Sequence, residues 1–190
     1  MDEYYAHTIR ISNFKIRDFD NLEKILQTGY LLSRKKQRAI GYKSIDNNVL
    51  TALFNGMNYI SLCDLKMNHD GNSAYDMYTK RGLSLLLDRD IPVIIPQVID
   101  QNDYNYFNIQ SFLGNKRYTN LIDEVQVKGS ISLEHLKGMC LSLSVFSSFY
   151  KHDYQEDYLK YLNLLLEKYH YNVPIYNLDD KEIIKINIKK

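Results

Sequence analysis

The chain has 190 residues, a formal net charge of +1 and an apolar fraction of 45%. That length predicts one domain, or one domain with an appendage, and it can enclose a core without a metal or disulfide. The near-zero charge excludes a global field that would attract nucleic acid or a membrane surface.

The cysteines and the hydropathy of the chain indicate the cellular compartment in which it works. The two cysteines, Cys63 and Cys140, do not make a disulfide framework. The N-terminus lacks the apolar core of a signal peptide, and no apolar run approaches the roughly 18 residues needed to span a bilayer. We therefore expect a cytoplasmic protein with reduced thiols and no membrane partner. The histidines lack metal-ligand spacing with each other or with the cysteines, so we expect no zinc site.

The first predicted element is a strand at residues 4–12. Period-two alternation puts Tyr5, His7 and Ile9 on one side of this strand and Ala6 and Thr8 on the other. The strand therefore carries a polar pair, His7 and Thr8, next to apolar residues.

A well-delimited helix is predicted next. Asp20 fits a helix N-cap, and Glu23 follows three residues later at the spacing of a capping box. Gly29 can take the left-handed conformation that ends a helix. Residues 33–48 are polar and basic, which predicts a loop.

The rest of the chain predicts short strands with helices between them. Further strands are expected at residues 58–63, 83–88, 91–96, 122–128, 173–176 and 183–188. Helical segments are expected at 49–56, 74–80, 132–139 and 153–169, and loops at 66–73 and 100–120. The 153–169 helix is amphipathic, and its expected inner face consists of Tyr158, Tyr161, Leu162, Leu165 and Leu166. This order predicts an α+β fold rather than a βαβ series. We expect residues 1–150 to form the main domain, with a C-terminal helix and strands at 151–190 packed on it.

One predicted strand carries a carboxylate that could line a polar cleft. In an extended 122–128 segment, Glu124 and Gln126 share one face, whereas Val125 and Val127 share the other. A carboxylate placed in this way can accept a hydrogen bond from a sugar hydroxyl and stabilise positive charge on an anomeric carbon. A solvated glutamate on an edge strand fits the same spacing.

The other candidate residues are a histidine, tyrosines and a basic cluster. His7 can donate one ring N–H to a ligand oxygen, but a structural histidine fits equally. Together, His7 and Glu124 suggest a cleft with the histidine on one wall and the glutamate on the other. Tyr59 and Tyr75 can stack on a flat ring or pack in the core. Arg34, Arg38 and their basic neighbours can bind phosphates or remain solvated.

Two segments resemble the opening of the NAD-dependent ADP-ribosyltransferases. They are the Tyr-x-His-Thr strand at residues 5–8 and the Asn-Leu-x-x-Ile-Leu-x-x-Gly-Tyr-Leu helix at residues 21–31. The DNA-targeting ADP-ribosyltransferase toxins are the nearest look-alikes, and the RNA 2′-phosphotransferases and poly-ADP-ribose polymerase-like enzymes are more distant. The resemblance covers roughly residues 4–140 and implies a split β-sheet core with flanking helices.

The resemblance also implies roles for particular residues. By position, Glu124 matches the catalytic glutamate of a late strand, and His7 with Thr8 matches the first-strand position that holds the nicotinamide ribose and amide. Tyr59 and Ser61 fall where the central-strand motif would lie. Tyr59 or Tyr75 would stack on nicotinamide, and Arg34 or Arg38 would meet the pyrophosphate or the acceptor.

The sequence differs from the arginine-specific toxins of this family at two places, and both concern the acceptor of ADP-ribose. Arginine-specific toxins carry Glu or Gln two residues before the catalytic Glu, where this chain has Ile122, and their Ser-Thr-Ser motif is not reproduced by Ile60-Ser61-Leu62. We therefore expect transfer of ADP-ribose from NAD to a macromolecule, with nucleic acid favoured slightly over protein. The alternative is a non-catalytic module of the same fold that binds a nucleotide or a protein. An antitoxin or host-factor partner would fit either function.

Overall fold

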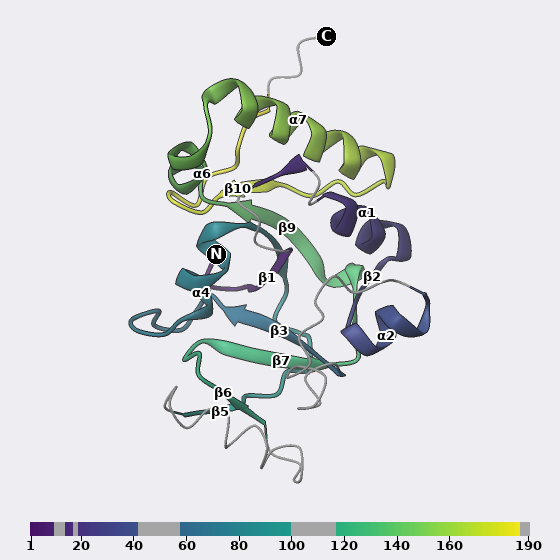
Figure 1. Cartoon of the computed structure of the whole chain (residues 1–190), viewed down its shortest axis with the longest axis vertical. Coiled ribbons are helices and arrows are strands. Elements are labelled where there is room, and N and C mark those ends of the chain that lie inside the picture. The colour runs from purple at the N-terminus through teal and green to yellow at the C-terminus, as the bar shows by residue number, and fades with distance from the viewer. Residues whose placement is uncertain (10–13, 17–18, 42–57, 100–116, 187–190) are drawn as a thin grey trace.

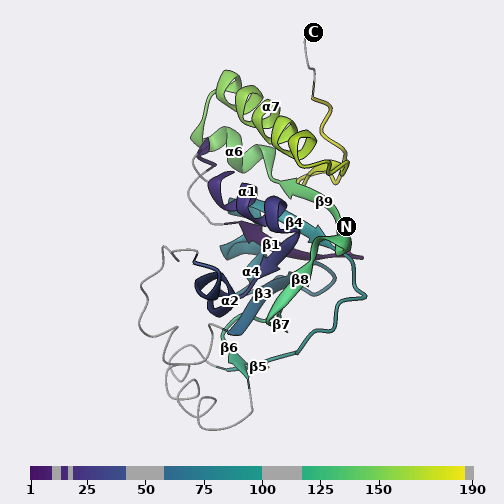
Figure 2. The same cartoon turned by 90° about the vertical axis from the view of Figure 1, so that its right-hand side faces the viewer.

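The computed structural model describes residues 1–9, 14–16, 19–41, 58–99 and 117–186. These residues form a mixed α+β fold around a six-stranded, mostly antiparallel sheet of order β10-β9-β4-β1-β3-β7. Two small two-stranded sheets, β2-β8 and β5-β6, flank it. Figure 1 shows α7 above the large sheet, α1 to the right of β9, and β5 and β6 below β7, and Figure 2 gives the perpendicular view.

The elements follow one another closely along the chain. The strands are β1 (Tyr5–Ile9), β2 (Tyr30–Leu32), β3 (Tyr59–Asp64), β4 (Leu83–Leu87), β5 (Gln97–Val98), β6 (Tyr118–Thr119), β7 (Glu124–Lys128), β8 (Ser130–Ser132), β9 (Leu136–Leu141) and β10 (Ile175–Asn177). The helices are α1 (Phe19–Thr28), α2 (Arg34–Ala39), α4 (Ala74–Met77), α6 (Leu143–Phe149) and α7 (His152–Lys168), with 3₁₀ turns η3 (Thr79–Arg81) and η4 (Leu133–His135). None of the helices within these described ranges is long and apolar enough to cross a membrane.

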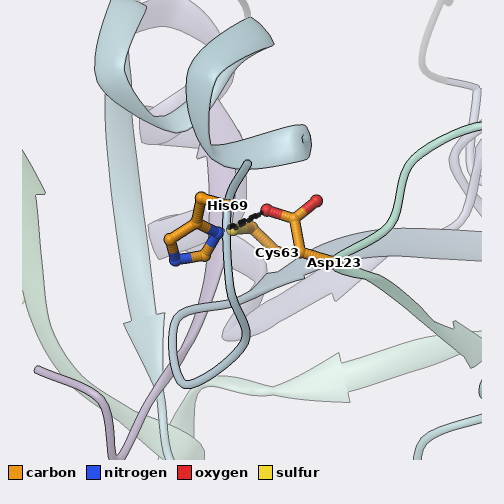
Figure 3. A group of neighbouring side chains, drawn as sticks. All are labelled: Cys63, His69 and Asp123. Carbon is orange, nitrogen blue, oxygen red and sulfur yellow. Dashed lines mark hydrogen bonds and ion pairs between the residues drawn. The ribbon is translucent and has the colours of Figure 1, made fainter. Parts of the chain in front are cut away.

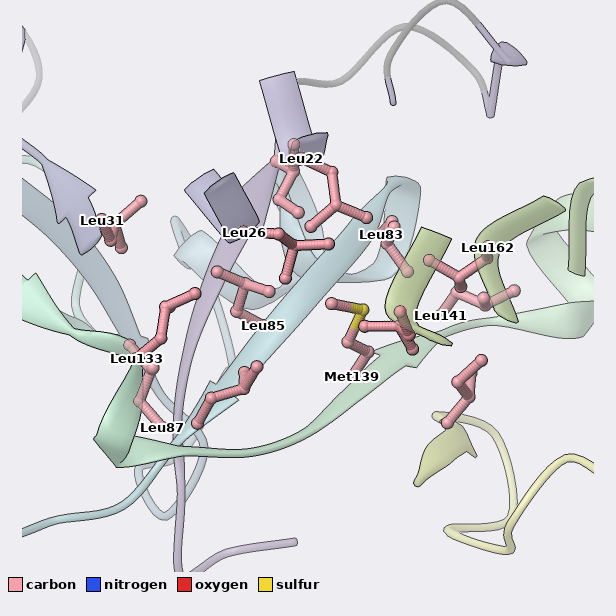
Figure 4. Packing of buried hydrophobic residues seen from close by; sticks show 14 of the residues in the cluster. Leu22, Leu26, Leu31, Leu83, Leu85, Leu87, Leu133, Met139, Leu141 and Leu162 are labelled. Atoms are coloured by element: carbon pink, nitrogen blue, oxygen red, sulfur yellow. The ribbon is translucent and has the colours of Figure 1, made fainter. Parts of the chain in front are cut away.

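The main hydrophobic core lies between one face of the large sheet and helices α1, α6 and α7. Leu85 of β4 and Met139 of β9 are fully buried there, against Leu22 of α1 and Leu162 of α7. Figure 4 shows these side chains meeting between the helices and the sheet. Burying such a side chain stabilises the fold by about 1.5–3 kcal/mol, so this layer supplies much of the driving force.

The opposite face of the sheet carries a smaller apolar cluster. Ala6, Cys63, Leu86 and Cys140 extend it across four strands, and Ala74 covers it from α4. Strand alternation explains the division, because neighbouring residues of one strand point to opposite faces.

The sheet is continuous on one side of β1 and interrupted on the other. The β1–β4 ladder runs the whole length of β1, from Tyr5↔Leu87 to Ile9↔Leu83. The β1–β3 ladder consists of Tyr5↔Asp64 and Ala6↔Cys63 alone. Beyond Ala6, therefore, β1 and β3 continue without main-chain pairing.

Several local predictions are confirmed. Strands are found at the expected places in β1, β3, β4, β7 and β10, and a long amphipathic helix is found in α7. Gly29 has φ +70° and its N–H donates to the Ile25 carbonyl at 3.0 Å, so it ends α1 as expected. Residues 49–56 and most of 100–120 lie outside the described residues.

Other local predictions are wrong. Asp20 is not the N-cap of α1, because the helix begins at Phe19 and Asp20 lies in its first turn. The Glu23 carboxylate accepts from Lys168 at 2.6 Å and from the Tyr169 hydroxyl at 2.9 Å. Residues 34–39 are the helix α2 rather than a loop. In the 91–96 segment, which contains two prolines, the described pairing is a single bridge from Ile94 to Gln126, because proline has no N–H to donate.

The C-terminal half differs from prediction at three places. The expected helix at 132–139 is the short turn η4 followed by strand β9, which places Leu136 and Met139 in the core as strand residues. Residues 183–188 were expected to form a strand, and the described part makes one bridge, from Ile183 to Tyr176. Tyr161, expected on the inner face of α7, is 43% exposed.

The central core gives the first testable prediction. Leu85→Ala removes a fully buried side chain from a strand that is paired on both sides. We expect the free energy of unfolding to fall by about 2–5 kcal/mol, measured by urea denaturation. Ile95→Ala, at a side chain that is 78% exposed, should change it by no more than about 0.5 kcal/mol. Equal losses in the two variants would contradict the assignment of the core.

Candidate functional site

Glu124 is a buried carboxylate held by donors of its own chain. It begins β7 and pairs with Cys63 of β3. One carboxylate oxygen accepts from the Thr119 hydroxyl of β6, and the other accepts from the Gln126 side-chain amide at 2.8 Å. These bonds fix the direction of the carboxylate, and two oxygens still offer lone pairs to a further donor.

A chain of polar contacts extends from Glu124 along the same face of the sheet. Gln126 is buried and its side-chain oxygen accepts from Arg117 Nε at 2.8 Å. The guanidinium of Arg117 lies 4.3 Å from the ring centroid of Tyr59. This Glu124 network (Thr119, Glu124, Gln126, Arg117 and Tyr59) therefore joins a buried acid on β7 to a cation, Arg117, that precedes β6 and lies over a tyrosine of β3.

His7 lies where the β1–β3 ladder ends. Its Nδ1 is 3.0 Å from the carbonyl oxygen of Ser61, so the half-buried imidazole takes up a carbonyl that strand pairing leaves open. Burial lowers the pKa of His7 below its usual value, and the Ser61 contact acts in the opposite direction. The ring is therefore neutral near pH 7, with one nitrogen as donor and the other as acceptor.

The expectation that His7 and Glu124 face each other across a cleft does not match the register. Ala6 pairs with Cys63, and Cys63 pairs with Glu124, so Ala6 and Glu124 share a face. His7, next to Ala6, alternates with Tyr5 and Ile9 toward the main core, the opposite face of the sheet. The two residues project from different faces, on strands that have β3 between them.

Three other predicted site residues do share the face of Glu124. Thr8 pairs with Ser84, and their hydroxyls are 2.9 Å apart. Ser61 pairs with Gln126 and is exposed, and Tyr59 pairs with Lys128. Thr8, Ser61, Tyr59 and Glu124 thus form a polar strip across three adjacent strands.

The remaining two predicted residues lie on flanking helices. Tyr75 of α4 stacks on His69, with ring centroids 4.3 Å apart and planes 16° apart, so one face of its ring is occupied. Arg38 is exposed on α2. The first turn of α2 is joined to the end of β7 by the Ser33 N–H, which donates to the Gly129 carbonyl at 2.8 Å. The basic helix therefore adjoins the far end of the Glu124 strand.

The sequence reasoning missed a second buried carboxylate beside Glu124. Asp123 is fully buried and accepts from the backbone N–H groups of Ala74 and Tyr75, at 2.5 and 3.0 Å, at the start of α4. Cys63 and His69 also contact it, and Figure 3 shows the three side chains converging. An Asp next to the predicted catalytic Glu was visible in the sequence, but its partners lie about 50–60 residues away.

Comparisons with protein-family models, curated proteins and solved structures find no match to this chain. The function of the chain is therefore inferred from the positions of its own residues.

The environment of His7 predicts a pH dependence of stability. Because the folded-state pKa is lowered from 6.5, the neutral ring stabilises the fold above about pH 6.5, and this contribution is lost as pH falls through the folded-state value. We expect His7→Asn to destabilise the protein more at pH 7.5 than at pH 5, in urea denaturation at both values. A destabilisation that grows on acidification would contradict a neutral, desolvated imidazole.

Proposed function

We propose that this chain transfers ADP-ribose from NAD to a macromolecular acceptor, with Glu124 as the catalytic carboxylate. The observation that carries the proposal is the order of three neighbouring strands. His7 on β1, Ser61 and Tyr59 on β3, and Glu124 on β7 occupy consecutive strands of one sheet, in the roles that the resemblance to ADP-ribosyltransferases implies. The two-pair β1–β3 ladder also fits the split sheet of that family.

In the proposed reaction, the bond between the ribose C1′ and the nicotinamide nitrogen breaks. Nicotinamide leaves with the bonding electron pair, which makes it neutral, and positive charge develops on the ribose ring. Glu124 accepts a hydrogen bond from a nicotinamide-ribose hydroxyl and stabilises that charge. A lone pair of the acceptor then forms the new bond to C1′, and the acceptor proton passes to a base or to solvent.

In this proposal the ribose lies beside the end of the β1–β3 ladder, where His7 Nδ1 and the Ser61 carbonyl are 3.0 Å apart, rather than on one face of the sheet. A ribose there would meet the imidazole of His7 from β1 and the exposed Ser61 from β3. With Nδ1–H donating to the Ser61 carbonyl, Nε2 of His7 is the acceptor nitrogen for a ribose hydroxyl. Thr8, on the Glu124 face, would meet the carboxamide in this proposal.

Nucleic acid is the acceptor that the surface favours. Helix α2 carries Arg34, Lys35, Lys36 and Arg38 and adjoins the end of β7. Cationic side chains beside the catalytic strand suit a phosphate backbone, which they position without reading bases. The overall charge of +1 gives no wider attraction, so this contact is local.

A non-catalytic binding module is the second candidate, and the state of Glu124 favours it. The carboxylate is buried and both of its oxygens already accept hydrogen bonds from Thr119 and Gln126. A glutamate held in this way can maintain the fold of a nucleotide-binding site without taking part in bond breaking.

The carboxylate gives the main test of catalysis. Glu124→Gln keeps the size of the side chain and removes its charge. We expect the rate of nicotinamide release from NAD, in the presence of cell lysate, to fall about 10²–10³-fold, the usual cost of losing one electrostatic contact to the transition state. Glu134→Gln, at an exposed glutamate of η4, is the matched control and should leave the rate unchanged. Equal rates for the wild type and Glu124→Gln would exclude the catalytic role.

Titration calorimetry with NAD separates the enzyme from the module. For the enzyme we expect NAD binding and nicotinamide release in the same preparation. Binding without release, unchanged in Glu124→Gln, would establish the module. An NAD titration without heat and without a rise in melting temperature would exclude both.

A further inference from the structure

Three potential metal ligands from separate parts of the chain meet beneath α4. Cys63 comes from β3, His69 from the loop that follows β3, and Asp123 from the residue before β7. One ligand atom of each lies within 4.8 Å of the other two. His69 Nδ1 is 2.8 Å, and Cys63 Sγ 3.4 Å, from the same oxygen of Asp123. These separations are close to those between neighbouring ligands of one tetrahedral ion.

The ligand types select a particular class of metal ion. A thiolate and an imidazole are borderline-soft donors that suit Zn²⁺ and Co²⁺, whereas Mg²⁺ and Ca²⁺ prefer oxygen alone. One thiolate and one carboxylate also neutralise a divalent ion, which removes most of the cost of burying charge at this position.

The three side chains are held in place before any metal binds. The imidazole of His69 is oriented by stacking on Tyr75. The carboxylate of Asp123 is oriented by the two N–H groups of α4, at Ala74 and Tyr75. Contacts of this kind are the outer-shell support that fixes ligand direction in metal sites.

We propose that Cys63, His69 and Asp123 bind one Zn²⁺ ion, with a water molecule as the fourth ligand. On binding, the thiol of Cys63 loses its proton to solvent and its sulfur forms a bond to the metal. His69 gives the ion access from outside, because its side chain is 22% exposed, whereas Asp123 is fully buried. The ion joins β3, the loop that follows β3 and the residue before β7, so it stabilises the strand that carries Glu124 without entering the transfer reaction.

Cobalt(II) titration of the full chain, after chelator treatment, tests this site directly. We expect the intense near-ultraviolet absorption of a thiolate–cobalt bond, saturating at one ion per chain. It should be absent in Cys63→Ser and retained in Cys140→Ser, the matched control at the other buried cysteine. Loss of the band in both variants, or its absence from the wild type, would overturn the proposal.

The melting temperature of the wild type gives a second measurement of Zn²⁺ binding, which does not depend on a variant that folds normally. The wild-type melting temperature should rise with Zn²⁺ concentration and return after chelation. His69→Gln should weaken Zn²⁺ by at least the roughly 10–100-fold that loss of an outer-shell partner costs. If the wild-type melting temperature does not change with Zn²⁺, or if His69→Gln binds Zn²⁺ as tightly as the wild type, the three residues form a hydrogen-bonded contact only.

Discussion

Burial of Val125 and Val127 in the main core is the constraint on which the rest of the structure depends. Both valines of β7 belong to the main core cluster, so alternation sends Glu124 and Gln126 to the other face of the sheet. A register shift of one residue would place the carboxylate in the apolar layer, where an unpaired charge is very costly. The apolar pattern of one short strand thus fixes where the candidate chemistry lies.

Polar groups on the Glu124 face are satisfied from within the chain. Thr119 and Gln126 fix the carboxylate of Glu124, and Arg117 continues this network. The neighbouring carboxylate of Asp123 is held separately by the N–H groups of α4. Donors and acceptors that are oriented before a ligand arrives need no reorganisation when charge develops, and this is the main way in which protein sites stabilise transition states. The same network rigidifies the edge of the sheet, because each member would cost stability if left unpaired.

Local signals in the sequence predicted the local elements, and contacts between distant segments were not predictable. The alternation of β1, the end of α1 at Gly29 and the apolar face of α7 depend on neighbouring residues and were predicted. The spacing of Leu136 and Met139 fits both a helix and a strand. Pairing with β4 is what makes this segment the strand β9. The relation between His7 and Glu124 depends on the register of three strands, and the meeting of His69 with Asp123 depends on a contact 54 residues apart.

The position of bound NAD tests the central claim most directly. A crystal structure of the chain with a non-hydrolysable NAD analogue would locate it. We predict that the nicotinamide ribose lies beside the end of the β1–β3 ladder, with a hydroxyl in hydrogen-bond reach of Glu124 and the ring near Ser61. An analogue bound elsewhere on the molecule, with the Glu124 carboxylate still contacted by Thr119 and Gln126 alone, would contradict the account.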